Sequence, residues 1–186
     1  LTGTLVLAIV AFIGTAAPGA PINVNFDKQG DDYSGSGPIS PDRSEWNTLQ
    51  TRGGSGPESA FDLDDADGNP TDVDVEVNWS NGVQSGSSAF SNHPGEALLE
   101  EFPKADADTG TADGITFSDL TAPAYDVYLI GGGTDAGSFI TYDIGGTTKT
   151  ANYADNSAWT EGDNYVVFRN VVPQSGEIEA TITNLN

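Results

Sequence analysis

Short runs of alternating apolar and polar residues recur along the chain, from Ile22–Phe26 near its start to Ile178–Ile182 near its end. Because successive side chains of a strand point to opposite faces, each run has one apolar and one polar face. Turns rich in Gly, Ser, Asp and Pro separate the runs. This pattern predicts an all-β protein built from antiparallel sheets that pack their apolar faces on a shared core.

The clearest amphipathic strand is Val73–Trp79, in which three valines and a tryptophan share one face. Further strands are predicted at Pro21–Phe26, Gly114–Phe117, Tyr125–Ile130, Ser138–Ile144, Tyr165–Arg169 and Glu177–Thr183. Their regular spacing, with Gly-rich turns between them, favours an antiparallel β-sandwich or jelly roll over alternating strands and helices. One short helical segment is predicted at Pro94–Phe102, which has Pro near its start and Glu in its body.

The first 20 residues form a hydrophobic N-terminal segment, and residues 21–186 are predicted to form a single β-sandwich domain. The apolar run 1–13 is too short for a membrane-spanning helix of about 20 residues, so no stable membrane span is expected. Two interpretations stay open. The segment resembles the apolar part of a signal peptide with its small-residue cleavage zone, or it is retained as an assembly strand. A retained segment must be covered by its own core, by a neighbouring subunit or by lipid.

The charge of the chain limits its partners. Acidic residues number 28 against six basic ones, which gives a formal net charge of −22. This excess repels phosphates and anionic headgroups, so no nucleic acid partner is expected. The chain has no cysteine, which excludes disulfides, thiolate metal sites and cysteine nucleophiles.

One acidic stretch has the composition of a calcium loop. The candidate ligands within residues 62–69 are Asp62, Asp64, Asp65, Asp67 and Asn69. Calcium takes six to eight oxygen ligands and tolerates irregular loops, so this stretch predicts a structural calcium site. The spacing does not match an EF-hand, and the alternative is an ordinary Asp-Gly-Asn turn before a strand.

Catalytic motifs are not recognisable in the sequence. His93 is the only histidine, and no serine occupies a G-x-S-x-G motif. The run Gly131–Ala136 matches a dinucleotide fingerprint, but a β-like run follows it where that fingerprint needs a helix. We therefore predict a non-enzymatic protein. A glycosidase-like pair of carboxylates remains the enzymatic alternative, because such a pair need only meet in space.

Aromatic and acidic residues in the predicted loops suit a carbohydrate ligand. The candidates are Trp46, Tyr153, Asp155, Trp159 and Glu161. The alternative is that loop tryptophans fold back as lids on the core. Trp46 lies with Leu49 in a long Gly- and Ser-rich stretch, which is expected to be pinned across one end of the fold.

Several short phrases carry a family resemblance. They are Ile22–Phe26, Tyr33–Gly37, Pro41, Trp46–Asn47, Tyr125–Leu129, Ile144–Gly146 and Glu161–Phe168. Together they resemble the secreted β-sandwich proteins of the PEP-CTERM type. The resemblance implies a bacterial protein exported to the cell envelope or outside the cell, with a galactose-binding-like jelly roll and no catalytic residues to carry over. The family's C-terminal sorting signal is absent from this chain.

These observations together predict an exported extracellular protein with a structural role, self-assembling into a filament or surface layer. The N-terminal segment would fill an open sheet edge of a neighbour, with Leu5, Leu7 and Ile9 as the inserted side chains. Glycans and other envelope proteins are further expected partners. The alternatives are a monomeric secreted binding module, which requires the segment to insert into its own fold, and a carbohydrate-active enzyme of jelly-roll fold.

Overall fold

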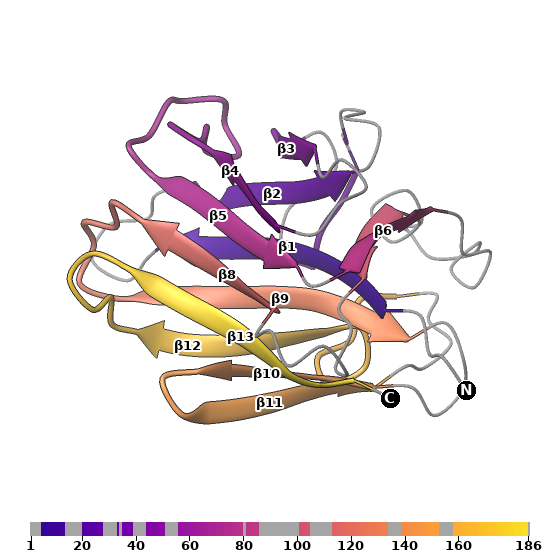
Figure 1. The fold of residues 1–186 in the computed structure, drawn as a ribbon. Helices are drawn as coiled ribbons and strands as arrows, with labels where there is room; N and C mark the ends of the chain where they lie inside the picture. Colours follow the sequence, from indigo (N-terminus) through magenta and orange to yellow (C-terminus); the bar gives the residue numbers. More distant parts are fainter. Residues whose placement is uncertain are drawn as a thin grey trace.

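The computed structural model describes residues 5–13, 20–27, 33, 35–38, 44–50, 56–79, 81–85, 101–104, 113–133, 139–152 and 158–185. This part of the chain is all-β and contains no helix, so it also contains none long and apolar enough to cross a membrane. The strands are β1 (Leu5–Ile13), β2 (Ile22–Asp27), β3 (Asn47–Gln50), β4 (Gly56–Ala60), β5 (Asp74–Trp79), β6 (Asn81–Ser85), β7 (Glu101–Lys104), β8 (Asp113–Ser118), β9 (Tyr125–Gly133), β10 (Phe139–Ile144), β11 (Thr147–Asn152), β12 (Tyr165–Val171) and β13 (Ile178–Leu185) (Figure 1).

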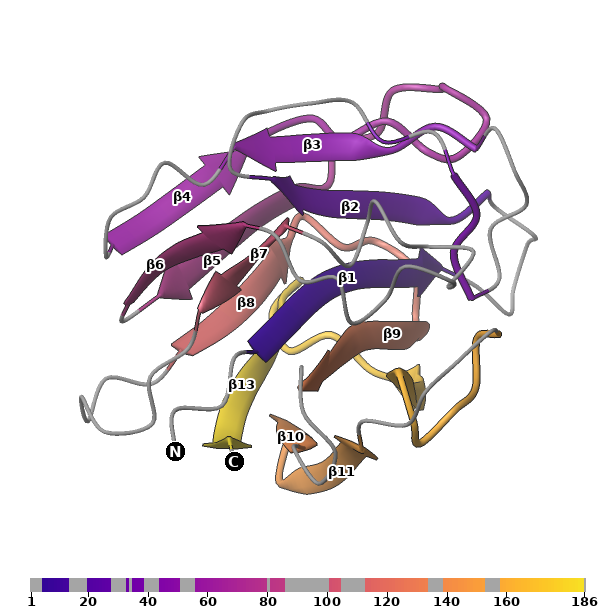
Figure 2. The same ribbon diagram turned by 90° about the vertical axis from the view of Figure 1, so that its right-hand side faces the viewer.

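The strands form two larger sheets and one hairpin. The five-stranded sheet has the order β12-β9-β1-β2-β3, the six-stranded sheet has the order β11-β10-β13-β8-β5-β4, and β6 pairs with β7. Figure 2 shows β3, β2, β1 and β9 following one another in the order of their sheet. Neighbouring strands run antiparallel except β2 and β3, which are parallel. The predicted antiparallel all-β class is therefore confirmed.

One hydrophobic core joins the two larger sheets. The five-stranded sheet contributes residues such as Phe26 and Leu129, and the six-stranded sheet contributes Val77, Phe117 and Tyr142, all at most 1% exposed. Burial alternates along β8 and again along β10, as the period-two pattern predicts. Each fully buried side chain of this size stabilises the fold by roughly 1.5–3 kcal/mol.

The predicted strands correspond to β2, β5, β8, β9, β10, β12 and β13, whereas the predicted helix is wrong where it can be compared. Glu101 and Phe102 belong to β7, where they pair with Ser85 and Gln84 of β6. Pro103 explains the difference, since it donates no backbone hydrogen bond and disfavours a helical residue before it. Residues 94–100 of that prediction lie outside the described part of the chain.

The prediction of a polar, solvated face on β2 is also wrong. Asn23 is 0% exposed and Asn25 is 3% exposed. Nδ2 of Asn23 donates a 2.8 Å hydrogen bond to the carbonyl of Glu45, and the backbone of Ala66 donates to the carbonyl of Pro21 at 2.6 Å. Neighbouring segments therefore cover β2, and the amide of Asn23 is buried only because it has a partner.

The N-terminal segment lies inside its own sheet. β1 is the middle strand of five and pairs with β2 on one side and β9 on the other. In this register Leu5, Leu7 and Ile9 pair with Gly133, Gly131 and Leu129. This is the arrangement that the monomeric alternative requires, and the contact of these three residues with another subunit stays a prediction.

Candidate functional site

A hydrogen-bonded turn precedes β12 and holds Glu161. The buried side chain of Asn164 donates from Nδ2 to the carbonyl of Ala158 at 2.9 Å and accepts at Oδ1 from the backbone of Thr160 at 2.9 Å. Gly162 has a φ of +89°, which favours glycine, and its N–H donates to the carbonyl of Tyr165 at 2.8 Å. These bonds fix the backbone that presents Glu161.

The same turn is attached to both larger sheets. The backbone of Gly131 in β9 donates to the carbonyl of Asn164 at 3.0 Å, and the backbone of Asn152 in β11 donates to the carbonyl of Gly162 at 2.9 Å. Because β9 and β11 belong to different sheets, the turn bridges them. Glu161 is therefore placed by the fold itself.

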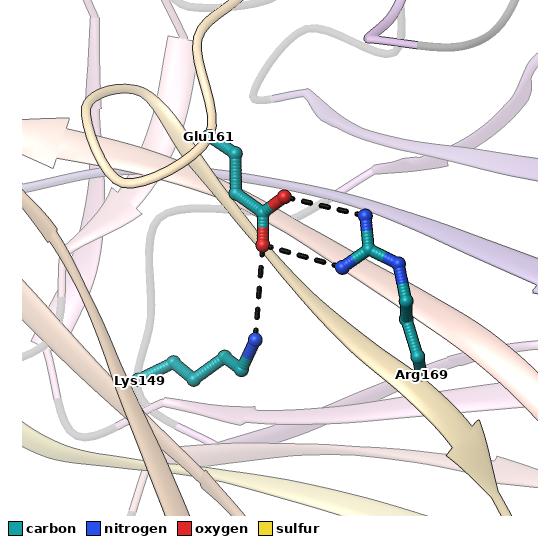
Figure 3. A network of polar contacts seen from close by, with 3 residues as sticks. All are labelled: Lys149, Glu161 and Arg169. Carbon is teal, nitrogen blue, oxygen red and sulfur yellow. Dashed lines mark hydrogen bonds and ion pairs between the residues drawn. The ribbon is translucent and has the colours of Figure 1, made fainter.

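Glu161 binds two basic side chains from the neighbouring edge strands (Figure 3). The guanidinium of Arg169 donates to both carboxylate oxygens, from Nη1 to Oε1 at 3.4 Å and from Nη2 to Oε2 at 3.3 Å. Nζ of Lys149 lies 3.7 Å from Oε1. The hydrogen bonds and charge of Glu161 raise the pKa of Arg169 further above its usual value. Since all three side chains are at least 36% exposed, these ion pairs are screened by solvent and contribute little to stability.

The side chain of Lys149 reaches from the six-stranded sheet to Phe168 in the five-stranded sheet. It lies on the edge strand β11, where it pairs with the core residue Tyr142. Its Nζ lies 5.8 Å from the ring centroid of Phe168 in β12. The aliphatic stem of a lysine covers apolar surface while its ammonium stays hydrated, and an inward-facing charge at an edge strand disfavours pairing with another chain. Lys149, Glu161 and Arg169 therefore connect the two edge strands β11 and β12.

Two tyrosines lie beside this network on β9 and β12. The rings of Tyr128 and Tyr165 are stacked, with centroids 6.1 Å apart and an interplanar angle of 28°. Tyr165 pairs with Ile130 and Tyr128 pairs with Val167, so the two rings are diagonal neighbours across adjacent strands. Ile130 and Val167 are fully buried but do not belong to the core cluster. The half-buried rings therefore occupy the face of the sheet that points away from the core.

The tyrosine hydroxyls are neutral at physiological pH. Desolvation raises the pKa of Tyr128, and Asp126 raises it further while Arg169 opposes the shift. Desolvation and the charge of Glu161 raise the pKa of Tyr165. Both phenols therefore remain protonated at neutral pH and can donate hydrogen bonds.

Asp126 fixes the backbone next to Arg169. Its Oδ1 accepts a 2.8 Å hydrogen bond from the N–H of Asn170, which has a positive φ of 56° at a bulge in β12. Bulges re-aim neighbouring side chains, so this bond contributes to the direction of Arg169. We call the set Asp126, Tyr128, Glu161, Tyr165 and Arg169 the Tyr–Arg surface.

A groove of about 990 Å³ adjoins the Tyr–Arg surface and shares Arg169 with it. Ile144, Phe168 and Ile178 give it apolar walls, and the 59% exposed side chain of Val172 also lines it. Its volume is at the upper end of the 300–1,000 Å³ that ligand pockets span. Asp143, Glu177 and Glu179 also line it, and the enzymatic alternative stays a prediction.

Of the residues predicted from the sequence to bind carbohydrate, the structure describes Trp46, Trp159 and Glu161. Trp46 is 4% exposed, donates from Nε1 to the carbonyl of Gly35 at 3.1 Å and meets the ring of Tyr33 edge-on at 4.9 Å. Its ring is therefore buried against a neighbouring loop segment and is not presented to solvent. Trp159 is half-buried in the turn that carries Glu161. Tyr153 and Asp155 lie outside the described residues.

Of those predicted residues, only Glu161 belongs to the Tyr–Arg surface. Tyr128, Tyr165 and Arg169 were not predicted because strand aromatics suggest core packing, whereas loop aromatics suggest ligands. The alternation along each strand could have identified the two tyrosines. Tyr128 lies two residues after Asp126, and Tyr165 lies four residues before Arg169, so each tyrosine is on the same strand face as a charged residue.

The predicted calcium loop is organised by its own hydrogen bonds. Oδ1 of Asp65 accepts from the backbone N–H groups of Asp67 and Asn69 at 2.9 Å, and Nδ2 of Asn69 donates to both of its oxygens. The backbone of Asp62 donates to Asp74, and that of Asp64 donates to the side chain of Asn47. In the described part of the chain no three acidic or histidine side chains are grouped to hold a metal ion, and calcium here stays a prediction.

Comparison with known proteins gives no relative from which a role could be transferred. No protein family, no curated protein and no solved structure matches the chain.

Proposed function

We propose that this chain is an exported, non-enzymatic β-sandwich of jelly-roll type that binds carbohydrate at the Tyr–Arg surface. The sandwich is supported by two larger sheets that share one core of alternating residues. The binding role is supported above all by the stacked pair Tyr128 and Tyr165, which lies half-exposed beside the bidentate pair Glu161 and Arg169.

This combination matches the two kinds of surface that a sugar presents. Aromatic side chains bury large apolar area with a polar hydroxyl at the end, which suits the C–H face of a pyranose ring. Guanidinium and carboxylate groups supply directional donors and acceptors for its hydroxyls. The turn at Glu161 and the bulge after Arg169 hold these groups before a ligand arrives, which lowers the entropy cost of binding.

Export is supported by the sequence alone. The resemblance to PEP-CTERM-type proteins agrees with a location in the cell envelope or outside the cell. The place of β1 inside its own sheet supports a monomeric module over assembly by an unpaired N-terminal strand.

The test is binding to a glycan array by the purified chain and two variants. Tyr165→Ala should lose most of the wild-type signal, because one of the two stacked rings is removed. Phe61→Ala is the matched control, since Phe61 is 71% exposed and lies outside the Tyr–Arg surface. Absence of any glycan signal from the wild-type chain would contradict the proposal, as would equal signals from the two variants.

A second candidate function is self-assembly by exchange of β1 between copies, with the donated strand taking the same central place between β2 and β9. A β1 strand donated by another copy would restore the same register, including the pair Ile9 and Val24. Because the chain has no cysteine, the double variant Ile9→Cys, Val24→Cys reports this directly. Exchange should give covalent multimers on a non-reducing gel. A disulfide confined to single chains would exclude it.

A further inference from the structure

We propose that the ligand of the Tyr–Arg surface is an uncharged pyranoside, and that sugars carrying a carboxylate are rejected. The proposal rests on the carbohydrate-binding function proposed above and adds the class of sugar. It follows from three properties of the surface: its aromatic platform, the state of its one guanidinium and the sign of the charge around it.

The aromatic platform is built from two strands that the fold holds in register. Tyr128 and Tyr165 are diagonal neighbours whose rings deviate from parallel by 28°. The buried side chains of Ile130 and Val167 lie on the same face. Each ring therefore has a buried apolar neighbour beside it, which limits the reorganisation that stacking of a sugar requires.

The guanidinium of Arg169 is already occupied by a carboxylate. Glu161 takes two of its five N–H donors in a bidentate pair, and Lys149 binds the same carboxylate. Arg169 is still 53% exposed, so its remaining donors face solvent. An incoming carboxylate would have to compete with Glu161, whereas a neutral hydroxyl can accept from a free N–H and donate to a carboxylate oxygen without breaking the pair.

The charge around the platform does not favour an anionic ligand. Asp126 and Glu161 offset the positive charges of Arg169 and Lys149, so these four side chains leave no net positive charge for an anion. Beyond the surface, the chain carries a net charge of −22, which repels any anion at low ionic strength. A neutral pyranoside meets neither penalty. Charge and hydrogen-bonding capacity therefore select the same class of ligand.

The experiment is affinity gel electrophoresis of the full chain in gels that contain one polysaccharide each. The neutral probes are glucan, galactan, mannan and xylan, and the anionic probes are alginate and polygalacturonate. The wild-type chain should be retarded by at least one neutral probe and by neither anionic probe. Tyr128→Ala and Tyr165→Ala should each weaken that retardation by roughly three- to tenfold, the expected range for one aromatic contact.

A charge variant tests the selectivity apart from the stacking. Glu161→Gln has nearly the same shape but frees the guanidinium of Arg169 and removes one negative charge. Because it also removes one acceptor for the neutral sugar, the readout is selectivity: the ratio of polygalacturonate binding to neutral-probe binding should rise, with measurable binding to polygalacturonate. Thermal unfolding of every variant checks its folding, and Tyr165→Phe, which keeps the ring, should bind the neutral probe within about threefold of wild type.

The outcomes separate the two levels of the proposal. If the wild-type chain binds none of the probes, the carbohydrate function itself fails. If it binds a neutral probe but the folded tyrosine variants bind equally well, the function stands and the site is wrong. If it prefers an anionic probe, or if Glu161→Gln does not change the selectivity, the site stands and the assigned class of sugar is wrong.

Discussion

The larger sheets approach each other at two pairs of edge strands, and these two sides are closed by different chemistry. β3 and β4 meet on one side, and β11 and β12 meet on the other. We call the first side the amide seam, formed by Asn23, Glu45, Asn47, Asp64 and Ala66, and the second the charge seam, formed by Lys149, Glu161 and Arg169. The amide seam uses neutral hydrogen bonds, and the charge seam uses exposed ion pairs.

Asn47 is the centre of the amide seam. Its Nδ2 donates to the carbonyls of Asp64 at 2.7 Å and Asn23 at 2.9 Å, and its Oδ1 accepts from the backbone of Asp64 at 2.8 Å. These bonds attach the loop before β5 to β2 and β3, and Leu63 of that loop is 2% exposed in the core. Neutral bonds between partly buried groups are not screened by salt.

The charge seam is different because water and ions reach all three of its side chains. Its ion pairs are screened as ionic strength rises, and they contribute little to the free energy of unfolding. The same exposure leaves its donors and acceptors available to a ligand. The comparison teaches that the amide seam holds the fold together, whereas the charge seam is available for function.

The largest expected loss of stability follows from a substitution in the loop of the amide seam. Leu63→Ala should lower the free energy of unfolding by about 2–5 kcal/mol, because it removes a buried side chain and leaves a cavity. Urea denaturation followed by tryptophan fluorescence measures the change. Phe61→Ala, two residues away and 71% exposed, should change it by less than about 0.5 kcal/mol. Equal effects of the two variants would show that the loop is not part of the core.

The next effect concerns the amide of Asn47. Asn47→Ala should cost about 1–3 kcal/mol, since it leaves the backbone groups of Asp64 and Asn23 without their partner. The loss should be the same at low salt and in 1 M NaCl, because no charged group is involved. A loss that disappears in high salt would mean that electrostatics, and not these hydrogen bonds, closes the amide seam.

The charge seam should respond in the opposite way. Glu161→Gln should lower stability by less than about 1 kcal/mol at low salt, and the difference should vanish in 1 M NaCl, where the Debye length is about 3 Å. Denaturation at the two salt concentrations measures it. A loss above about 2 kcal/mol that persists in salt would assign the charge seam a structural role and weaken its interpretation as a ligand surface.

The comparison also explains which features the sequence could predict. The alternation in β5, β8 and β10 is visible because one face is buried and the other is wet, and these strands were predicted. β3 and β11 escaped prediction because these two strands have few apolar positions: Leu49 is the only buried residue of β3, and Ala151 is the only one of β11.

The candidate site was harder to predict than the fold. Glu161 was selected for its loop position, but its contacts with Lys149 and Arg169 depend on how β11 and β12 meet, which no local pattern encodes. Asn23 and Asn25 were expected to be solvated because the local alternation in β2 likewise does not show which distant segments cover the strand. Their burial depends on segments that lie far from β2 in the sequence and cover it only in the folded chain.

The smallest expected effect lies in the turn of the loop that carries Leu63. Desolvation alone would raise the pKa of Asp65, but the hydrogen bonds from Asn69 and from the backbone of Asp67 outweigh it and lower the pKa below 3.8. Because the folded pKa is depressed, this stabilisation is fully present above the unfolded pKa near 3.8 and is lost as the pH falls through the folded value.

Asp65→Asn should therefore be slightly less stable than wild type at pH 7, and the difference should shrink as the pH falls below 3.8. Asp67→Asn is the matched control, because Asp67 serves the turn through its backbone N–H, and its substitution should leave the hydrogen bonds to Asp65 in place. Urea midpoints between pH 2.5 and pH 7 measure both. If Asp65→Asn kept the wild-type pH dependence, the Asp65 carboxylate would not act as the charged acceptor of this turn, and the loop of the amide seam would be held by its backbone bonds and by Asn47 alone.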